Sequence, residues 1–278
     1  MIADCGGTST SWAAIGPDAP RTTVITAGYN AASAPEGALA ESLTTLPTLA
    51  GAVSEVRFYG AGCANADICR RVANELKSVF HDAEIHVASD MLGAARALCG
   101  RSKGIVAIIG TGSNSCLYDG ENIIANTPPL GYILGDEAGG AVIGKNFLCH
   151  FFKGLFDSDI ANDFKAEYPS LTTASLIERV YRQPGANTWL ASFMPFISRH
   201  KDHPQVSALL EEEFSRFLSH NIMPYHPAPG TPVHFVGSVA YHLRDIIAKA
   251  LQNSYLSLGT ILQSPLDALV RYHSATKR

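Results

Sequence analysis

Residues 104–118 read GIVAIIGTGSNSCLY, and this stretch decides the fold. An apolar, β-branched run ends at Ile109, a Gly-Thr-Gly-Ser-Asn turn follows, and a second apolar run ends at Tyr118. The pattern predicts two strands joined by a tight turn. Glycine at positions 110 and 112 allows a positive φ and a close approach to a ligand, and the hydroxyl and N–H groups of the turn can converge on an anion. An ordinary hairpin with a glycine-rich turn has the same pattern.

A second stretch near the start of the chain repeats this arrangement. Residues 2–15 read IADCGGTSTSWAAI, in which a short apolar start leads through Asp4 to a Gly-Gly-Thr-Ser-Thr turn and a further strand from Trp12 to Ile15. Each half of the chain therefore offers one hairpin whose turn is rich in glycine and hydroxyl groups. Two such turns predict two related lobes that close on one polyphosphate.

Composition limits the possible functions. A length of 278 residues suits two compact domains, and 46% hydrophobic against 17% charged residues argues against a disordered chain or a coiled coil. The net charge is −4 and no run of Lys or Arg occurs, which argues against nucleic-acid binding. No apolar run reaches the ~18 residues that a membrane span needs, and no signal sequence is recognisable. We therefore expect a cytoplasmic protein with no membrane partner.

The cysteines do not form a metal-binding pattern. None belongs to a CxxC pair, so the sequence gives little support for zinc or an iron–sulfur cluster. Most of them lie beside apolar residues, as buried thiols do in a reducing compartment. The six cysteines are Cys5, Cys63, Cys69, Cys99, Cys116 and Cys149.

The first half, residues 1–103, predicts an α/β lobe with the order β-β-β-α-β-α-β-α. After the first hairpin, we expect strands at 21–26, 55–60 and 84–88 and helices at 35–48, 63–80 and 91–99. Two polar residues follow strands in this half. Asn30 can both donate to and accept from a neutral ligand, or be a turn residue. Asp90 lies where ligand-facing carboxylates gather in α/β sheets, or caps the next helix.

The second half, residues 104–264, restarts the pattern. We expect strands at 104–109, 113–118, 121–126, 232–236 and 255–262, a loop at 128–132, and helices that end near 155 and 252. Residues 159–226 are helical by periodicity, with breaks near prolines 169, 184, 204 and 224, and read as a helical insertion. Residues 265–278 predict a C-terminal helix that crosses back to the first lobe.

Two short segments of the second half carry candidate ligand groups. We expect Asp136 and Glu137 in the first turn of a helix, where the helix dipole stabilises carboxylates; as an acidic pair flanked by glycines, they could instead bind sugar hydroxyls or the water shell of a metal. Gly237 and Ser238 lie at a strand-to-helix turn that can admit a flat ring or ribose, or that is simply a connection.

These motifs resemble the sugar kinase/actin/Hsp70 ATPase superfamily, and within it the BadF/BadG-type ATPases that include N-acetylglucosamine kinases. The resemblance covers nearly the whole chain in the family's order. The segments that carry it are ADCGGTSTSW, GYNAAS, YGAGC, ASDMLGAARA, IIGTGSNS, LGYILGDEAGG, VGSVAYH and SPLDALVRYH. The family often has Lys where Ser9 stands, and its vertebrate-type kinases have Trp where Leu130 stands.

The resemblance implies an actin-like ATPase fold of two ribonuclease H-like lobes with a central cleft and a helical insertion in the second lobe. It implies ATP and Mg²⁺ as cofactors, Asp90 as the catalytic base and Asp4 as the metal-directed carboxylate. The implied nucleotide-binding residues are Gly6, Gly7, Thr8, Ser9, Thr10, Gly110, Thr111, Gly112, Ser113, Gly237 and Ser238. The implied substrate-binding residues are Asn30, Asp90, Asn114, Gly131 and Asp136.

The function that the resemblance implies is phosphorylation of a small-molecule amino sugar, N-acetylglucosamine to its 6-phosphate, by a protein that can form a homodimer. Two other functions stay open at this point. Some relatives are ATPase activators of dehydratases or reductases, which hold an iron–sulfur cluster across a dimer. Alternatively, Ser9 in place of Lys fits a sugar-binding protein with weak catalysis.

Overall fold

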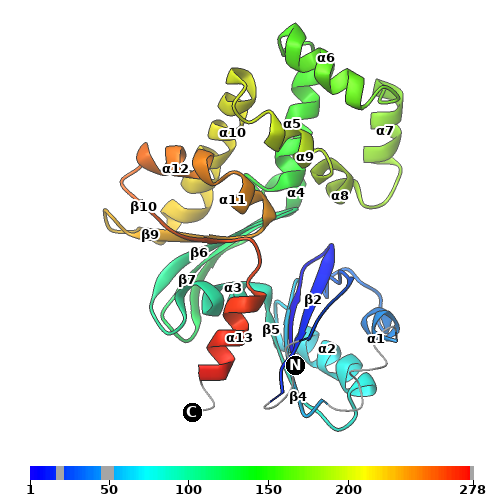
Figure 1. Ribbon diagram of the computed structural model, residues 1–278, viewed down its shortest axis with the longest axis vertical. Helices are drawn as coiled ribbons and strands as arrows, with labels where there is room; N and C mark the ends of the chain where they lie inside the picture. Colours follow the sequence, from blue (N-terminus) through cyan, green and yellow to red (C-terminus); the bar gives the residue numbers. More distant parts are fainter. Residues whose placement is uncertain (17–21, 45–52, 276–278) are drawn as a thin grey trace. The chain divides into compact units, whose positions relative to one another are not determined.

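The computed structural model describes residues 1–16, 22–44 and 53–275, and in it the chain folds into two compact units (Figure 1). Unit 1 comprises Met1–Lys103, Tyr118–Ile124 and the segment that begins at Ser264, and unit 2 comprises Gly104–Leu117 and Ala125–Gln263. The sequence places Tyr118–Ile124 in the second half. In the structure the Tyr118 hydroxyl donates to the Gly100 carbonyl at 3.1 Å, which ties this turn to unit 1.

The sheet of unit 1 has the strand order β3-β2-β1-β4-β5. Its first three strands form an antiparallel meander, and β4 and β5 add in parallel to β1. The register aligns Cys5, Gly60 and Ser89, the last residues of the three parallel strands. The strands are β1 (Ile2–Cys5), β2 (Ser9–Ala14), β3 (Thr22–Ala27), β4 (Glu55–Gly60) and β5 (Glu84–Ser89).

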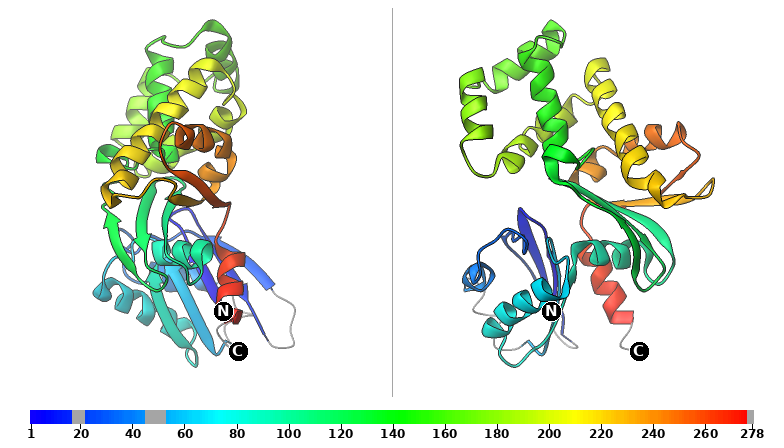
Figure 2. Two further views of the ribbon diagram at one scale, coloured as in Figure 1. Left: turned by 90° about the vertical axis from the view of Figure 1, so that its left-hand side faces the viewer. Right: turned by 180° about the vertical axis from the view of Figure 1, so that it is seen from behind.

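Helices cover both faces of this sheet. On one face, α1 (Ala38–Leu43) and α2 (Ala66–Val79) enclose a core with Trp12 at its centre. On the other face, α13 (Leu266–Ala275) packs beside α3 (Asp90–Cys99), as Figures 1 and 2 show. The segment that begins at Ser264 thus returns to unit 1. Because successive strand residues alternate between faces, Asp4 lies on the same face as Ile2, which packs with α13.

The sheet of unit 2 has the order β10-β9-β6-β7-β8, which is the same topology as in unit 1. A hairpin pair begins each sheet, and two later strands add in parallel to its first strand. The two related α/β units agree with the predicted actin-like ATPase fold class. The strands are β6 (Gly104–Ile109), β7 (Ser113–Tyr118), β8 (Ile123–Thr127), β9 (Pro232–Val236) and β10 (Ser257–Leu262).

Helices form most of the remainder of unit 2. Side chains of β6 and β9 pack with α5, α10, α11 and α12 in one core, and the insertion extends it with a phenylalanine cluster around Phe147 and Phe164. The helices are α4 (Gly131–Leu134), α5 (Gly140–Phe152), α6 (Ser158–Glu167), α7 (Thr173–Tyr181), α8 (Ala186–Ala191), α9 (Met194–Arg199), α10 (Pro204–Phe217), α11 (Ser238–His242) and α12 (Arg244–Gln252). A π-helical turn (Leu218–Ile222) continues α10, and a 3-10 turn (Met223–Tyr225) follows it.

Several predicted boundaries are wrong. The loop expected at 128–132 contains the start of α4, and the helix expected at 35–48 is the shorter α1; residues 45–48 and Arg21 lie outside the described residues. Ser89, not Asp90, caps α3, because its hydroxyl accepts the Leu92 N–H at 3.2 Å. Among the described residues, no helix is long and apolar enough to span a bilayer.

Candidate active site

In unit 1, the turn between β1 and β2 is fixed to the segment that follows β3. The Gly28 N–H donates to the Thr8 carbonyl at 3.1 Å, and the Tyr29 N–H donates to the Gly6 carbonyl at 3.1 Å. A Cβ on Gly28 would lie 2.4 Å from the Thr8 backbone, so glycine is required there. Gly7 and Ser9 remain exposed at the tip of this turn. The turn is therefore rigid at its base and open at its tip.

Thr10 does not lie at the open tip, which corrects its expected role as a nucleotide ligand. It is fully buried, and its hydroxyl lies 3.0 Å from the Ala27 carbonyl and 3.0 Å from the Cys5 sulfur. The reason is the strand alternation, which turns Thr10 into the core below the exposed Ser9. Thr10 supports the turn from within.

Asp4 and Asp90 are neighbours within unit 1. Asp4 is the third residue of β1, and Asp90 follows β5 at the start of α3, at the carboxyl end of the parallel strands. Burial and the nearby Asp90 raise the pKa of Asp4 to about 7, and burial raises the pKa of Asp90. The Met91 N–H donates to the Asp90 carboxylate at 2.8 Å and orients it. Two neighbouring carboxylates of this kind can hold a cation between them, and a carboxylate with a raised pKa can accept a proton.

The Asn30 loop of unit 1 is held by backbone contacts. Asn30 is exposed, and its side-chain oxygen accepts the Ala32 N–H at 3.0 Å. The Arg71 guanidinium donates to the Ala31 carbonyl. Gly62 has φ +76°, and a Cβ on it would lie 2.3 Å from the Asn30 side-chain oxygen. Glycine is therefore required at position 62 to bring the two loops together.

In unit 2, the turn between β6 and β7 rests on the start of α5. The Gly110 N–H donates to the Gly112 carbonyl at 2.9 Å, and the Gly140 N–H donates to the Gly110 carbonyl at 2.8 Å. Glycine would allow a positive φ at positions 110 and 112, but neither residue adopts one. A close approach does occur at Gly112, where a Cβ would lie 2.5 Å from the Asp136 carboxylate. The Ser113 hydroxyl is buried and has no hydrogen-bond partner among residues 1–16, 22–44 and 53–275.

Asp136 joins the two loops of unit 2 that carry predicted site residues. Its carboxylate accepts the backbone N–H groups of Ser113 and Gly131, while burial raises its pKa. The expected position in the first turn of a helix is wrong, because α5 begins at Gly140 and Asp136 has φ +53°. A left-handed residue cannot continue a helix, so the segment 135–139 is a loop that presents Asp136 to the turn.

The remaining predicted residues of unit 2 lie close to this turn. Gly237 has φ +123°, and a Cβ on it would lie 2.2 Å from the carbonyl oxygen of Ile109, the residue before the turn. Ser238 is exposed at the start of α11. The Asn114 side-chain oxygen accepts the Asn126 amide at 2.9 Å, which fixes the orientation of the Asn114 amide group.

The structure thus assembles two groups of predicted residues, one in each unit. Unit 1 brings together Asp4, Asp90 and the Gly6–Ser9 turn, and unit 2 brings together the Gly110–Asn114 turn, Gly131, Asp136 and Gly237.

Sequence reasoning left three supporting residues of unit 2 out of the predicted site. The sequence singles out Glu137 only as half of an acidic pair with Asp136. His220 and Asn221 contact Glu137 from a π-helical turn that a helical periodicity does not reveal.

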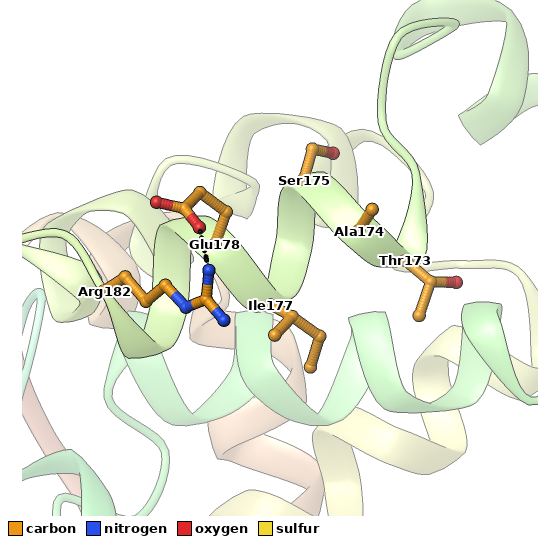
Figure 3. A pocket seen from close by; sticks show the side chains of 6 residues that line it. All are labelled: Thr173, Ala174, Ser175, Ile177, Glu178 and Arg182. Atoms are coloured by element: carbon orange, nitrogen blue, oxygen red, sulfur yellow. Dashed lines mark hydrogen bonds and ion pairs between the residues drawn. The ribbon is translucent and has the colours of Figure 1, made fainter.

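A surface pocket on unit 2 is separate from these residues. It lies along α7, where Thr173, Ile177 and Arg182 contribute to its walls and Glu178 pairs with Arg182 at 3.2 Å (Figure 3). None of its lining residues belongs to the predicted site.

Comparisons with known proteins identify relatives among solved structures. No protein-family model matches the sequence, and a search of curated proteins gives no match. The crystal structure of a candidate N-acetylglucosamine kinase from Porphyromonas gingivalis is 41% identical, covers 100% of this chain and 99% of that chain, and has a TM-score of 0.94.

Two further solved structures share the fold at lower identity. A candidate N-acetylglucosamine kinase from Chromobacterium violaceum is 19% identical over 98% of each chain, with a TM-score of 0.69. A ROK family glucokinase from Streptomyces griseus, in complex with glucose and AMPPNP, is 13% identical over 98% of this chain and 97% of that chain, with a TM-score of 0.56.

Proposed function

Because the chain belongs to the N-acetylglucosamine kinase-like family of the sugar kinase/actin/Hsp70 superfamily, we propose that it is an ATP-dependent sugar kinase. The acceptor is an amino sugar, N-acetylglucosamine, and the product is its 6-phosphate. The observation that carries this proposal is the pair of carboxylates, Asp4 and Asp90, at the carboxyl ends of the parallel strands in unit 1.

Asp90 is the catalytic base of the proposed reaction. It hydrogen-bonds the attacking sugar hydroxyl, orients the oxygen toward the γ-phosphorus and accepts the proton as the new P–O bond forms and the bond to the ADP oxygen breaks. Its raised pKa brings its basicity closer to neutral pH, where a base is most effective.

Asp4 is the residue suited to Mg²⁺. Asp4 and Asp90 are neighbouring carboxylates whose negative charges repel each other, and a bound cation would relieve this repulsion. Mg²⁺ often binds one or two carboxylates and keeps several waters. When bound, the ion neutralises charge on the β- and γ-phosphates. Asp4 would hold the ion beside the turn formed by Gly6, Gly7, Thr8 and Ser9. The exposed tip of this turn offers N–H and hydroxyl donors to the phosphates.

The second nucleotide loop is the Gly110–Ser113 turn of unit 2. Its support is its likeness to the Gly6–Ser9 turn, since both are hairpin turns rich in glycine and hydroxyl residues that can present N–H and hydroxyl donors to an anion. Thr111 belongs to the same turn. Gly237 and Ser238 contact the adenosine part of ATP in the proposed complex. Thr10 is left out because its side chain is buried in the core of unit 1.

The acceptor sugar is recognised by amide, carboxylate and backbone groups. Asn30 and Asn114 each have the amide oxygen engaged within the protein, so that each NH₂ group can donate to a sugar oxygen. Asp136 accepts two backbone N–H groups and retains lone pairs for a sugar hydroxyl. Gly131 leaves open space where a side chain would stand.

An ADP-release assay tests the proposal. Purified protein with ATP and Mg²⁺ is offered N-acetylglucosamine, glucosamine, N-acetylmuramic acid, N-acetylmannosamine and glucose separately, and we expect the highest kcat/KM with N-acetylglucosamine. Asp90→Asn should lower kcat by about 10²–10⁴ and leave nucleotide affinity unchanged. Near-normal turnover by Asp90→Asn would exclude Asp90 as the base.

A further inference from the structure

The loop that carries Asp136 is strained and must be held by its surroundings. Asp136 and Ala138 have φ +53° and +58°, values that residues other than glycine rarely adopt. Each left-handed residue of this kind costs free energy on folding. Such strain persists only where neighbouring contacts determine the conformation.

Glu137, which lies between these two residues, makes such contacts. One carboxylate oxygen lies 2.9 Å from His220 Nδ1, and the other accepts the Asn221 side-chain amide at 2.9 Å. The Glu137 side chain is only 12% exposed. Burial alone would raise its pKa, but the hydrogen bonds from His220 and Asn221 lower it. Since protein donors engage both carboxylate oxygens, Glu137 is a fixed anchor.

The two partners of Glu137 are themselves anchored to β7 and β8. They lie in the π-helical turn Leu218–Ile222, and π-turns are rare and frequently mark functional sites. The Asn221 backbone carbonyl accepts the Ser115 hydroxyl at 2.9 Å and the Thr127 hydroxyl at 3.1 Å. The turn therefore holds Glu137 against the sheet.

These contacts form a closed ring of hydrogen bonds within unit 2. The Ser113 N–H donates to Asp136, Glu137 accepts from Asn221, and Asn221 accepts from Ser115, which lies two residues after Ser113 on β7. A closed ring fixes Asp136 relative to the Gly110–Ser113 turn more firmly than any single bond would. The strained backbone and the ring are thus two parts of one arrangement.

We infer that Glu137 is a positioning residue of the active site, which acts through the π-turn residues His220 and Asn221 to hold Asp136 in its acceptor-binding conformation. The inference rests on the proposed function for the role of Asp136. If the contacts of Glu137 are weakened, we expect the sugar to bind less tightly. The residues that bind the phosphates of ATP should be unaffected.

The experiment exchanges the carboxylate of Glu137 and the amide of Asn221 across their hydrogen bond. Glu137→Gln removes the charge and presents an amide to Asn221, and Asn221→Asp places two carboxylates together. The double variant restores one donor and one acceptor with their positions exchanged. Glu178→Gln, an exposed carboxylate of α7, is the matched control.

We expect both single variants to raise the sugar KM by about tenfold or more, as displacements of about 1 Å do, while the KM for ATP and the melting temperature stay close to wild type. The double variant should recover much of the sugar KM, and Glu178→Gln should match wild type. A wild-type sugar KM in Glu137→Gln, or a double variant no better than the single ones, overturns the inference.

Hydrogen exchange separates this inference from the proposed function. In Glu137→Gln we expect faster amide exchange confined to residues 131–139 and 110–116, whatever substrate the enzyme uses. If the wild-type protein transfers no phosphoryl group to any sugar, the proposed function fails while exchange still tests the anchor. Should Glu137→Gln unfold, His220→Gln removes only the half-exposed contact, and unchanged exchange in that variant overturns the inference.

Discussion

His273 on the C-terminal helix gives a prediction whose size follows from the structure. The residue is 8% exposed, and its Nε2 lies 2.7 Å from the Tyr59 hydroxyl, while the Tyr59 hydroxyl accepts a hydrogen bond from Arg96 at 3.0 Å. Burial, followed by the charges of Arg57 and Arg96, lowers the pKa of His273 from 6.5 to about 4. The imidazole is therefore neutral in folded unit 1 at neutral pH.

The direction of the pH effect follows from linkage. Below pH 6.5 the unfolded chain binds a proton at His273 that the folded unit takes up only near pH 4, so stability is lost as the pH falls through this window. The full difference corresponds to about 3 kcal/mol, and about 2 kcal/mol of it is lost by pH 5. Asp4 acts in the opposite direction, since its raised pKa makes the folded unit bind a proton more readily than the unfolded chain.

Because these effects oppose each other, only a comparison with a variant isolates His273. His273→Gln keeps an acceptor for Tyr59 but cannot titrate. In a Trp189→Phe background, Trp12, which is fully buried in unit 1, is the only tryptophan and reports unfolding in urea. We expect the stability of wild type relative to His273→Gln to fall by about 2 kcal/mol between pH 7 and pH 5. A difference that does not change with pH, or that grows as the pH falls, would refute the reasoning; the exposed His81→Gln should follow wild type.

Three further predictions concern the site. Asp4→Asn should raise the unfolding midpoint of the protein without nucleotide at pH 8, because it removes a buried charge beside Asp90, and should weaken Mg²⁺-dependent ATP binding in calorimetry. Ser113→Ala should leave the melting temperature in a thermal unfolding scan unchanged or slightly higher, since the buried hydroxyl has no hydrogen-bond partner within the described part of the chain. Gly62→Ala should destabilise unit 1 by more than the control Gly37→Ala in urea unfolding, because both glycines have positive φ but only a Cβ at 62 meets another atom.

Much of the fold could be predicted from short-range patterns. The two hairpins with glycine-rich turns recur because the two sheets share one strand order, and the strand at 232–236 has the predicted bounds because Pro232 and Gly237 limit it on both sides. The placement of Asp90 after a parallel strand also followed from the sequence, since an apolar run and a polar Ser-Asp pair mark that junction.

The errors arose where tertiary contacts override local preference. An acidic pair before a glycine-rich run favours a helix start, but hydrogen bonds from Ser113 and Gly131 draw Asp136 into a left-handed conformation and delay α5 to Gly140. The π-turn after α10 continues a helical periodicity, so no local signal announces it. Glycine permits a positive φ without requiring it, so the residue type alone does not predict the conformation. Gly62 adopts a positive φ, whereas Gly110 does not.

The course of the chain through unit 1 has a consequence for its biosynthesis. This unit takes residues from three separate parts of the sequence, and its last part, α13, covers Ile2, Tyr59 and Ala13 on one face of the sheet. A ribosome that has released only the first hundred or so residues has therefore exposed an incomplete domain, in which α3 already packs on this sheet face but the part that α13 covers is still open to solvent. Unit 1 can be completed only after α13 leaves the exit tunnel, and a stop codon shortly before Leu266 would leave Ile2, Ala13 and Tyr59 without the packing that α13 provides.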